Sequence, residues 1–131
     1  MGHEEAFVKA FIAPDKQARW MQFLSNPKRR SEILDRLNHN LPYNPALGTE
    51  VPGNQDHPAG LERLLKAKGA GPVCHVIADG SKIDGQELPL SVALREIGTH
   101  EFGAVLSCLP GRLAYYKPES PGRGIILEVR K

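Results

Sequence analysis

The chain has 131 residues, of which 40% are hydrophobic and 24% are charged, a balance that is typical of a globular protein and argues against disorder. Its 17 Lys and Arg residues against 15 Asp and Glu leave a formal charge of +2, which is too small by itself to indicate a nucleic-acid or membrane partner. The length predicts a single domain, residues 1–131.

Cysteine usage and the first residues bear on the compartment. Cys74 and Cys108 lie in apolar runs without a Cys-x-x-Cys spacing, which predicts reduced core thiols rather than a disulfide or a zinc site. The start of the chain lacks the basic and apolar segments of a signal peptide, and no stretch approaches the roughly 18 apolar residues of a membrane span. We therefore expect a cytoplasmic protein. Met-Gly-His is also typical of a vector-derived start, so His3 carries no weight.

The N-terminal third is predicted to be helical. Residues 4–12 place apolar side chains on one helical face, although the same letters also suit a short strand. A second helix is expected over about 15–24, after Pro14. Asn26 and Pro27 then provide a cap and a first-turn proline for a third helix, whose apolar stripe is Ile33, Leu34, Leu37 and Leu41.

Residues 40–57 interrupt this pattern. The segment contains three prolines and two glycines, which predicts a long loop without regular structure. Loops of this length are often functional. Tyr43, Leu47 and Val51 would equally suit a loop that is pinned to the core, and the sequence leaves both interpretations open.

The remaining segments predict a sheet with two more helices. A helix is expected over 58–68, a strand buried on both faces over 73–79 and a short helix over 90–97. Residues 102–117 predict a central hairpin that turns at Pro110-Gly111, with Phe102 on one face of its first strand. The side chains of residues 125–130 alternate between an apolar face and a more polar one, which predicts an edge strand with one solvent-exposed face.

Together these elements predict an α+β fold with N-terminal helices packed on a mixed, mainly antiparallel sheet of about four strands. A helix separates the 73–79 strand from the first hairpin strand. This order predicts that the two strands lie parallel, joined by a right-handed crossover.

Chemical motifs are weak. A metal-dependent hydrolase using His75, His100 and Asp79 is one alternative, but His75 and Asp79 would lie about 13 Å apart along a strand at roughly 3.3 Å per residue. Cys108 lies among apolar neighbours and Ser107 lacks a nucleophile elbow. No phosphate-loop or dinucleotide motif predicts a cofactor, and whether the chain is an enzyme stays open.

A basic segment raises a second alternative, weak nucleic-acid binding. Its cations are Lys28, Arg29 and Arg30, at the start of the third helix, and Arg36 further along it. Positive charge in a first helical turn opposes the helix dipole, so something must compensate for it. An anionic partner would do so, as would solvent or the neighbouring Glu32.

The leading hypothesis is a small soluble binding or regulatory domain without catalytic chemistry, with an unknown protein or small-molecule partner and no membrane. We expect it to act through a surface formed by the 40–57 loop and the hairpin. Tyr115 and Tyr116 should lie on opposite faces of one strand, with one of them exposed near Arg112. The candidate ligand or partner residues are His39, Tyr43, His75, Arg112 and Tyr115.

Overall fold

The computed structural model describes residues 2–39, 41–119 and 122–129. Its helices are α1 (His3–Phe11), α2 (Gln17–Leu24), α3 (Arg30–Leu34), α4 (Pro58–Ala67) and α5 (Leu90–Gly98). Its strands are β1 (Gly48–Glu50), β2 (Val73–Ala78), β3 (Glu87–Pro89), β4 (Ala104–Leu109), β5 (Leu113–Lys117) and β6 (Ile125–Glu128). Short 3₁₀ turns cover Pro14–Lys16, Asp35–Asn38, Pro45–Leu47 and Gly53–Gln55. The helices and strands that the sequence predicts are all present, the third helix in shortened form.

The strands of the described residues form one sheet in the order β1-β6-β5-β4-β2-β3, and every neighbouring pair is antiparallel. The predicted α+β class, with N-terminal helices on a mainly antiparallel sheet, is confirmed, although the sheet has six strands rather than about four. The parallel arrangement predicted for β2 and β4 is wrong. Strand β3 is the reason, because it reverses the chain before α5. The helical crossover therefore joins β3 to β4, with β2 between them.

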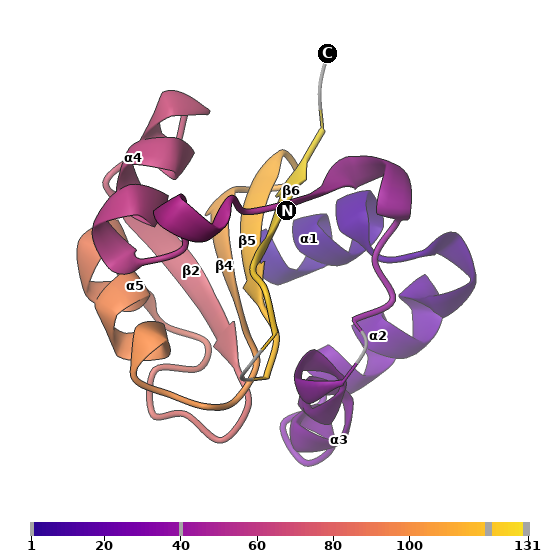
Figure 1. Ribbon diagram of the computed structural model, residues 1–131. Coiled ribbons are helices and arrows are strands. Elements are labelled where there is room, and N and C mark those ends of the chain that lie inside the picture. The colour runs from indigo at the N-terminus through magenta and orange to yellow at the C-terminus, as the bar shows by residue number, and fades with distance from the viewer. Residues whose placement is uncertain (1, 40, 120–121, 130–131) are drawn as a thin grey trace.

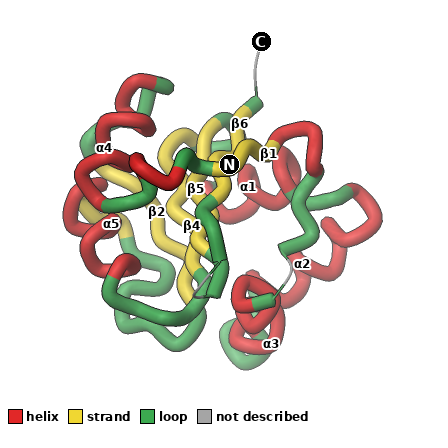
Figure 2. Tube along the Cα trace, in the orientation of Figure 1, coloured by secondary structure: helices red, strands yellow, loops and turns green. Residues whose placement is uncertain are grey.

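Helices cover both faces of the sheet (Figure 1). Helices α1, α2 and α3 lie on one side, where Phe11, Trp20 and Leu37 join a core cluster with Ile77 and Tyr116. Helices α4 and α5 lie on the other side, where a second cluster includes Leu61, Leu65, Leu94, Leu106 and Tyr115. Figure 2 shows the strands between these two groups of helices. The sheet thus separates two independent faces of the molecule, each covered by its own helices.

The central hairpin forms as predicted, with β4 paired to β5 and a positive φ of 70° at Gly111 in the turn. Tyr115 and Tyr116 lie on opposite faces, also as predicted. Neither is exposed, however, because their exposed fractions are only 2% and 3%. The expectation of one exposed tyrosine is therefore wrong, since a layer of helices covers each face of the sheet.

Two further expectations, for the edge of the sheet and for the start of the hairpin, are wrong. Strand β6 is not an edge strand, because β1 pairs with it, and β1 comes from the 40–57 segment for which no regular structure was expected. Phe102 lies outside the hairpin and is 51% exposed, since β4 begins only at Ala104. Gly103, the residue before β4, lies against the 3₁₀ turn Asp35–Asn38. A Cβ on Gly103 would overlap the carbonyl of Leu37 in that turn.

Cys74 and Cys108 are buried free thiols, as predicted. Burial raises the pKa of each thiol to about 12, so both are protonated and unreactive at neutral pH. Among the described residues, no helix is both long and apolar enough to cross a bilayer.

Candidate functional site

A cavity of about 260 Å³ opens between helices α4 and α5 and the end of strand β5. We call it the α4–α5 cavity. Its apolar wall consists of Pro58, Leu61, Leu94 and Ile97. Its polar groups come from Asp56 and His57, where the 40–57 segment meets α4, and from Tyr115 and Lys117 on β5. A concave apolar wall with a few convergent polar groups is the usual composition of a small-molecule site.

The carboxylate of Asp56 is held in place by two donors. Its Oδ1 accepts a hydrogen bond of 3.3 Å from the Tyr115 hydroxyl, and its Oδ2 accepts one of 3.2 Å from the Gly124 amide. Burial and the charge of Asp56 both raise the pKa of Tyr115, which keeps the hydroxyl protonated as a donor. Each carboxylate oxygen has two lone pairs, so Asp56 can still accept hydrogen bonds from a ligand.

Lys117 provides the positive charge of the cavity. Its Nζ donates to the carbonyls of His100 and Phe102, at 2.6 and 3.0 Å. Burial lowers the pKa of Lys117, while the charges of Asp56 and Glu101 oppose that shift. An ammonium group has three hydrogens, and two of them have these backbone partners. The third can donate to a ligand.

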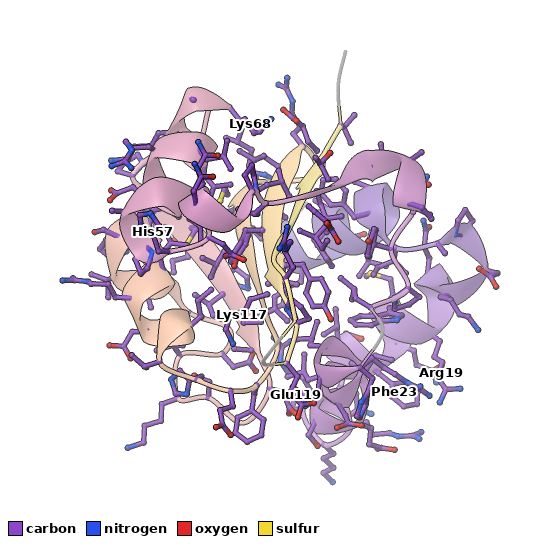
Figure 3. The ribbon with its side chains drawn as sticks, in the orientation of Figure 1. Arg19, Phe23, His57, Lys68, Lys117 and Glu119 are labelled. Atoms are coloured by element: carbon purple, nitrogen blue, oxygen red, sulfur yellow. The ribbon has the colours of Figure 1, made fainter. Side chains whose placement is uncertain are left out.

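His57 caps helix α4 at the rim of the cavity. Its Nδ1 accepts a hydrogen bond of 3.2 Å from the Gly60 amide, which places the proton of the neutral ring on Nε2. Figure 3 shows His57 at the start of α4 and Lys117 at the end of β5 on the same side of the molecule. The cap therefore fixes the position of an imidazole beside the opening.

A glycine allows the close packing behind the carboxylate. A Cβ on Gly124 would stand 2.6 Å from the ring and hydroxyl of Tyr115, closer than real Cβ contacts allow. Gly124 therefore lets the tyrosine lie flat against the backbone that donates to Asp56.

The structure brings only one of the predicted ligand residues to this cavity, Tyr115. His39 is exposed and lies 3.7 Å from Asp35, and Tyr43 packs against the core on the α1–α3 side. Arg112 is exposed and follows the hairpin turn, at the opposite end of β5 from Lys117. The 40–57 segment and the hairpin both contribute to this cavity, through Asp56 and His57 and through Tyr115 and Lys117.

His75 belongs to a different group of polar residues, which we call the Glu4–Arg30 network. Its Nε2 lies 2.8 Å from Oε2 of Glu4, and its ring stacks on His3 with centroids 5.4 Å apart. His3 in turn lies 2.7 Å from the hydroxyl of Ser107, whose side chain is buried. His75 is therefore a hydrogen-bonded residue within the fold.

Arg30 is the centre of this network. Its guanidinium makes paired hydrogen bonds to Glu4, at 2.6 and 2.7 Å, and to Asp84, at 2.8 and 2.9 Å. It also donates to the carbonyl of Leu24. Burial alone would raise the pKa of Glu4, but hydrogen bonds from His75 and Arg30 outweigh it and lower that pKa to about 2. Arg30, one of the predicted anion-binding residues, is thus already engaged by two carboxylates of the chain.

The other predicted anion-binding residues do not form one site. Arg29 pairs with Glu32 and lies over the ring of Phe23, which is the compensation by a neighbouring acid that the sequence allowed. Lys28 is exposed. Arg36 lines a different cavity, together with Lys16 and Arg19.

Two of the three residues of the metal alternative have other partners, and the third, His100, lines a small cavity together with Asp79. Asp79 accepts a hydrogen bond of 2.7 Å from Asn38, and His75 contacts Glu4. In the part of the chain that the structure describes, no three His, Cys, Asp or Glu residues are arranged to hold a metal ion. Within the described residues, His75, His100 and Asp79 therefore do not form one metal-holding group.

Sequence reasoning missed Asp56, His57 and Lys117. His57 had a local signal, because it precedes Pro58 at a helix start, where a capping residue is expected. Asp56 and Lys117 had no local signal, because they reach the same cavity only through the way the 40–57 segment folds back to β5. Comparisons of the chain with protein-family models, curated proteins and solved structures found no match.

Proposed function

We propose that the protein is a small binding or regulatory domain and that the α4–α5 cavity is its site for a small molecule. The observation that supports this most is unused hydrogen-bonding capacity beside an apolar wall. Asp56 is oriented by Tyr115 and Gly124, and Lys117 by two carbonyls, yet each can make a further hydrogen bond. Groups that are fixed in advance bind a ligand with less loss of entropy.

The cavity also limits the kind of ligand. Its volume of about 260 Å³ lies just below the range of roughly 300–1,000 Å³ that is typical of drug-sized ligands. A smaller molecule with an apolar body would contact Leu61, Leu94 and Ile97. A donor on that molecule would suit Asp56, and an acceptor or anionic group would suit Lys117.

The proposal is for binding alone. Among the described residues that line the cavity there is no Ser, Thr or Cys, and Asp56, His57 and Lys117 already make hydrogen bonds within the fold. Asp56 and Tyr115 are already paired with each other, which gives them an orienting role.

A fragment screen observed by ¹H–¹⁵N NMR tests the proposal. The probes are small aromatic and aliphatic compounds that carry an amine, a carboxylate or both. We expect the strongest binders to shift the amide signals of Asp56, Leu94, Tyr115 and Lys117. Binders that shift only signals elsewhere would contradict the proposal.

Gly98 offers a variant that fills the cavity. It is the last residue of α5 and lines the opening, and a Cβ on it would make an ordinary contact of 3.8 Å with Pro58. Gly98→Leu should therefore fold normally, with better helix propensity than glycine, and place its side chain in the opening. We expect it to weaken fragment binding at least tenfold.

The matched control is Ala67→Leu, at the exposed last residue of α4, which does not line the cavity. It adds a leucine to a helix end but should leave fragment affinity within about twofold, since it removes no contact to the cavity. Equal affinity of wild type and Gly98→Leu would reject the cavity as the site.

A further inference from the structure

A second cavity lies on the opposite side of the sheet and is basic. It has a volume of about 230 Å³ and is lined by Lys16, Arg19, Trp20, Ile33, Arg36 and Pro42. Lys16 comes from the turn before α2, Arg19 from α2 and Arg36 from the turn after α3. Half of its lining residues are cations and none is an acid. We call it the basic cavity.

The cations of the basic cavity are not neutralised within the described residues. Arg29 pairs with Glu32, Arg30 with Glu4 and Asp84, and His39 lies near Asp35, but no ion pair involves Lys16, Arg19 or Arg36. Arg19 lies over the ring of Phe23, with its guanidinium carbon 5.1 Å from the ring centroid, and the two are labelled together in Figure 3.

Three acids, Asp15, Glu32 and Asp35, lie near these cations, and Asp35 directly precedes Arg36 at the exposed surface, 3.7 Å from His39. Glu32 feels the charge of Arg19, but the larger effects that lower its pKa come from its hydrogen bond with Arg29. Asp15 precedes Lys16 and is exposed. None of these acids lines the cavity, so the charged side chains that face it are all cations.

The shape of the basic cavity separates it from a scattered set of surface cations. Trp20 and Ile33 form an apolar floor and are only 2% exposed. Charges around a concave, low-dielectric surface focus the field and concentrate a counter-ion there. Lys16, Arg19 and Arg36 are themselves exposed, so the concave apolar floor is what distinguishes this group from cations on a convex surface.

The side chains also indicate the chemistry of the anion. Guanidinium groups match phosphate oxygens through paired hydrogen bonds, and a lysine adds a compact charge. A phosphate monoester carries a charge of about −1.5 to −2 at pH 7, which suits three cations. Trp20 is too buried to stack on a nucleobase, so this cavity lacks the platform that single-stranded nucleic acid uses.

We propose that the basic cavity binds phosphate, either inorganic phosphate or the phosphate group of a small phosphorylated molecule. The site differs from the nucleic-acid surface expected from the sequence, because it uses Lys16 and Arg19 and shares only Arg36 with it. It is independent of the α4–α5 cavity, which lies against the other face of the sheet.

Trp20 makes the proposal easy to test, because it is the only tryptophan of the chain and lines the cavity. The purified protein is titrated with inorganic phosphate and with glycerol phosphate at fixed ionic strength, adjusted with sodium chloride. Binding is followed by tryptophan fluorescence and by isothermal titration calorimetry, which does not depend on the tryptophan. We expect saturable binding with one site per chain. Tighter binding of glycerol phosphate would identify a phosphorylated molecule as the ligand, and equal or tighter binding of inorganic phosphate would identify the free ion.

Arg36→Gln should weaken phosphate binding at least tenfold. Arg112→Gln, which removes an exposed arginine outside the cavity, should change it less than twofold. No saturable binding by calorimetry, or the same affinity in Arg36→Gln, would overturn the proposal. So would a single-stranded oligonucleotide that binds through Arg36 while phosphate does not bind, because that result would assign these cations to a polyanion.

Discussion

Replacing Arg30 by glutamine perturbs the Glu4–Arg30 network at its centre. The substitution removes the paired hydrogen bonds to Glu4 and to Asp84 and the bond to the Leu24 carbonyl. Two carboxylates would then share the site without a cation. Removal of one partner from a buried ion pair is costly because the remaining charge is left without compensation.

The magnitude follows from the exposure of the three side chains. Arg30 is 18% exposed, Glu4 24% and Asp84 20%, so the network is partly but not fully buried. Breaking a fully buried pair costs about 3–5 kcal/mol, whereas an exposed pair contributes about 0–1 kcal/mol. We expect Arg30→Gln to lower the free energy of unfolding by about 2–4 kcal/mol, because the network lies nearer the buried case. The melting temperature should fall by roughly 10 °C for a chain of this length.

Chemical and thermal unfolding at pH 7 measure this loss, and the adjacent residue provides a matched control. Arg29 pairs with Glu32 at the exposed surface, so Arg29→Gln should leave the stability almost unchanged. Similar losses in Arg30→Gln and Arg29→Gln would refute the reasoning, because they would show that the buried network contributes no more than an exposed ion pair.

Three more results are expected. Because the pKa of Glu4 is lowered in the folded protein, the ionised carboxylate stabilises the fold above its unfolded pKa of about 4.5, and this stabilisation is lost as the pH falls toward 2. Free energies of unfolding measured between pH 6 and 2 should therefore fall by at most about 3 kcal/mol through this group. The Glu4→Gln variant should lack this pH-dependent loss. Gly103→Ala should destabilise the protein by about 2 kcal/mol or more in urea unfolding, because its Cβ would overlap the Leu37 carbonyl; an unchanged midpoint would disprove that overlap. Cys74 and Cys108 should resist a thiol reagent at pH 8 until the protein is unfolded, since burial raises the pKa of both; prompt labelling of the native protein would contradict their burial.

The basic segment shows what local sequence can and cannot predict. Lys28, Arg29 and Arg30 were expected in the first turn of a helix, where positive charge is unfavourable. Helix α3 begins only at Arg30, and Arg29 is compensated by Glu32, three residues away. Arg30 finds its partners 26 and 54 residues away, at Glu4 and Asp84. The need for compensation could be predicted from helix electrostatics, but these distant partners depend on the tertiary fold.

The sheet shows a similar division. Strands with a strong apolar pattern, such as β2 and β4, were predicted within a few residues of their ends. Strands β1 and β3 have three residues each, too few for an alternating pattern to be recognised. The absence of β3 from the prediction is also the source of the wrong orientation of β2 relative to β4.

The α4–α5 cavity could be predicted only in outline. The sequence drew attention to the segment 40–57 and the hairpin, and the cavity is lined by residues from both, including Tyr115. Its hydrogen bond to Asp56 joins residues 59 positions apart, which no local pattern encodes. Lys117 was missed because its role depends on the path of the backbone between α5 and β4, whose carbonyls it binds.

The most direct test of the account is the location of a bound fragment, measured by intermolecular nuclear Overhauser effects between its protons and assigned methyl groups. We expect contacts to the methyls of Leu61, Leu94 and Ile97, which line the α4–α5 cavity. Contacts confined to Ile33 and Leu34, on the α1–α3 side of the sheet, would contradict the assignment of this cavity as the ligand site.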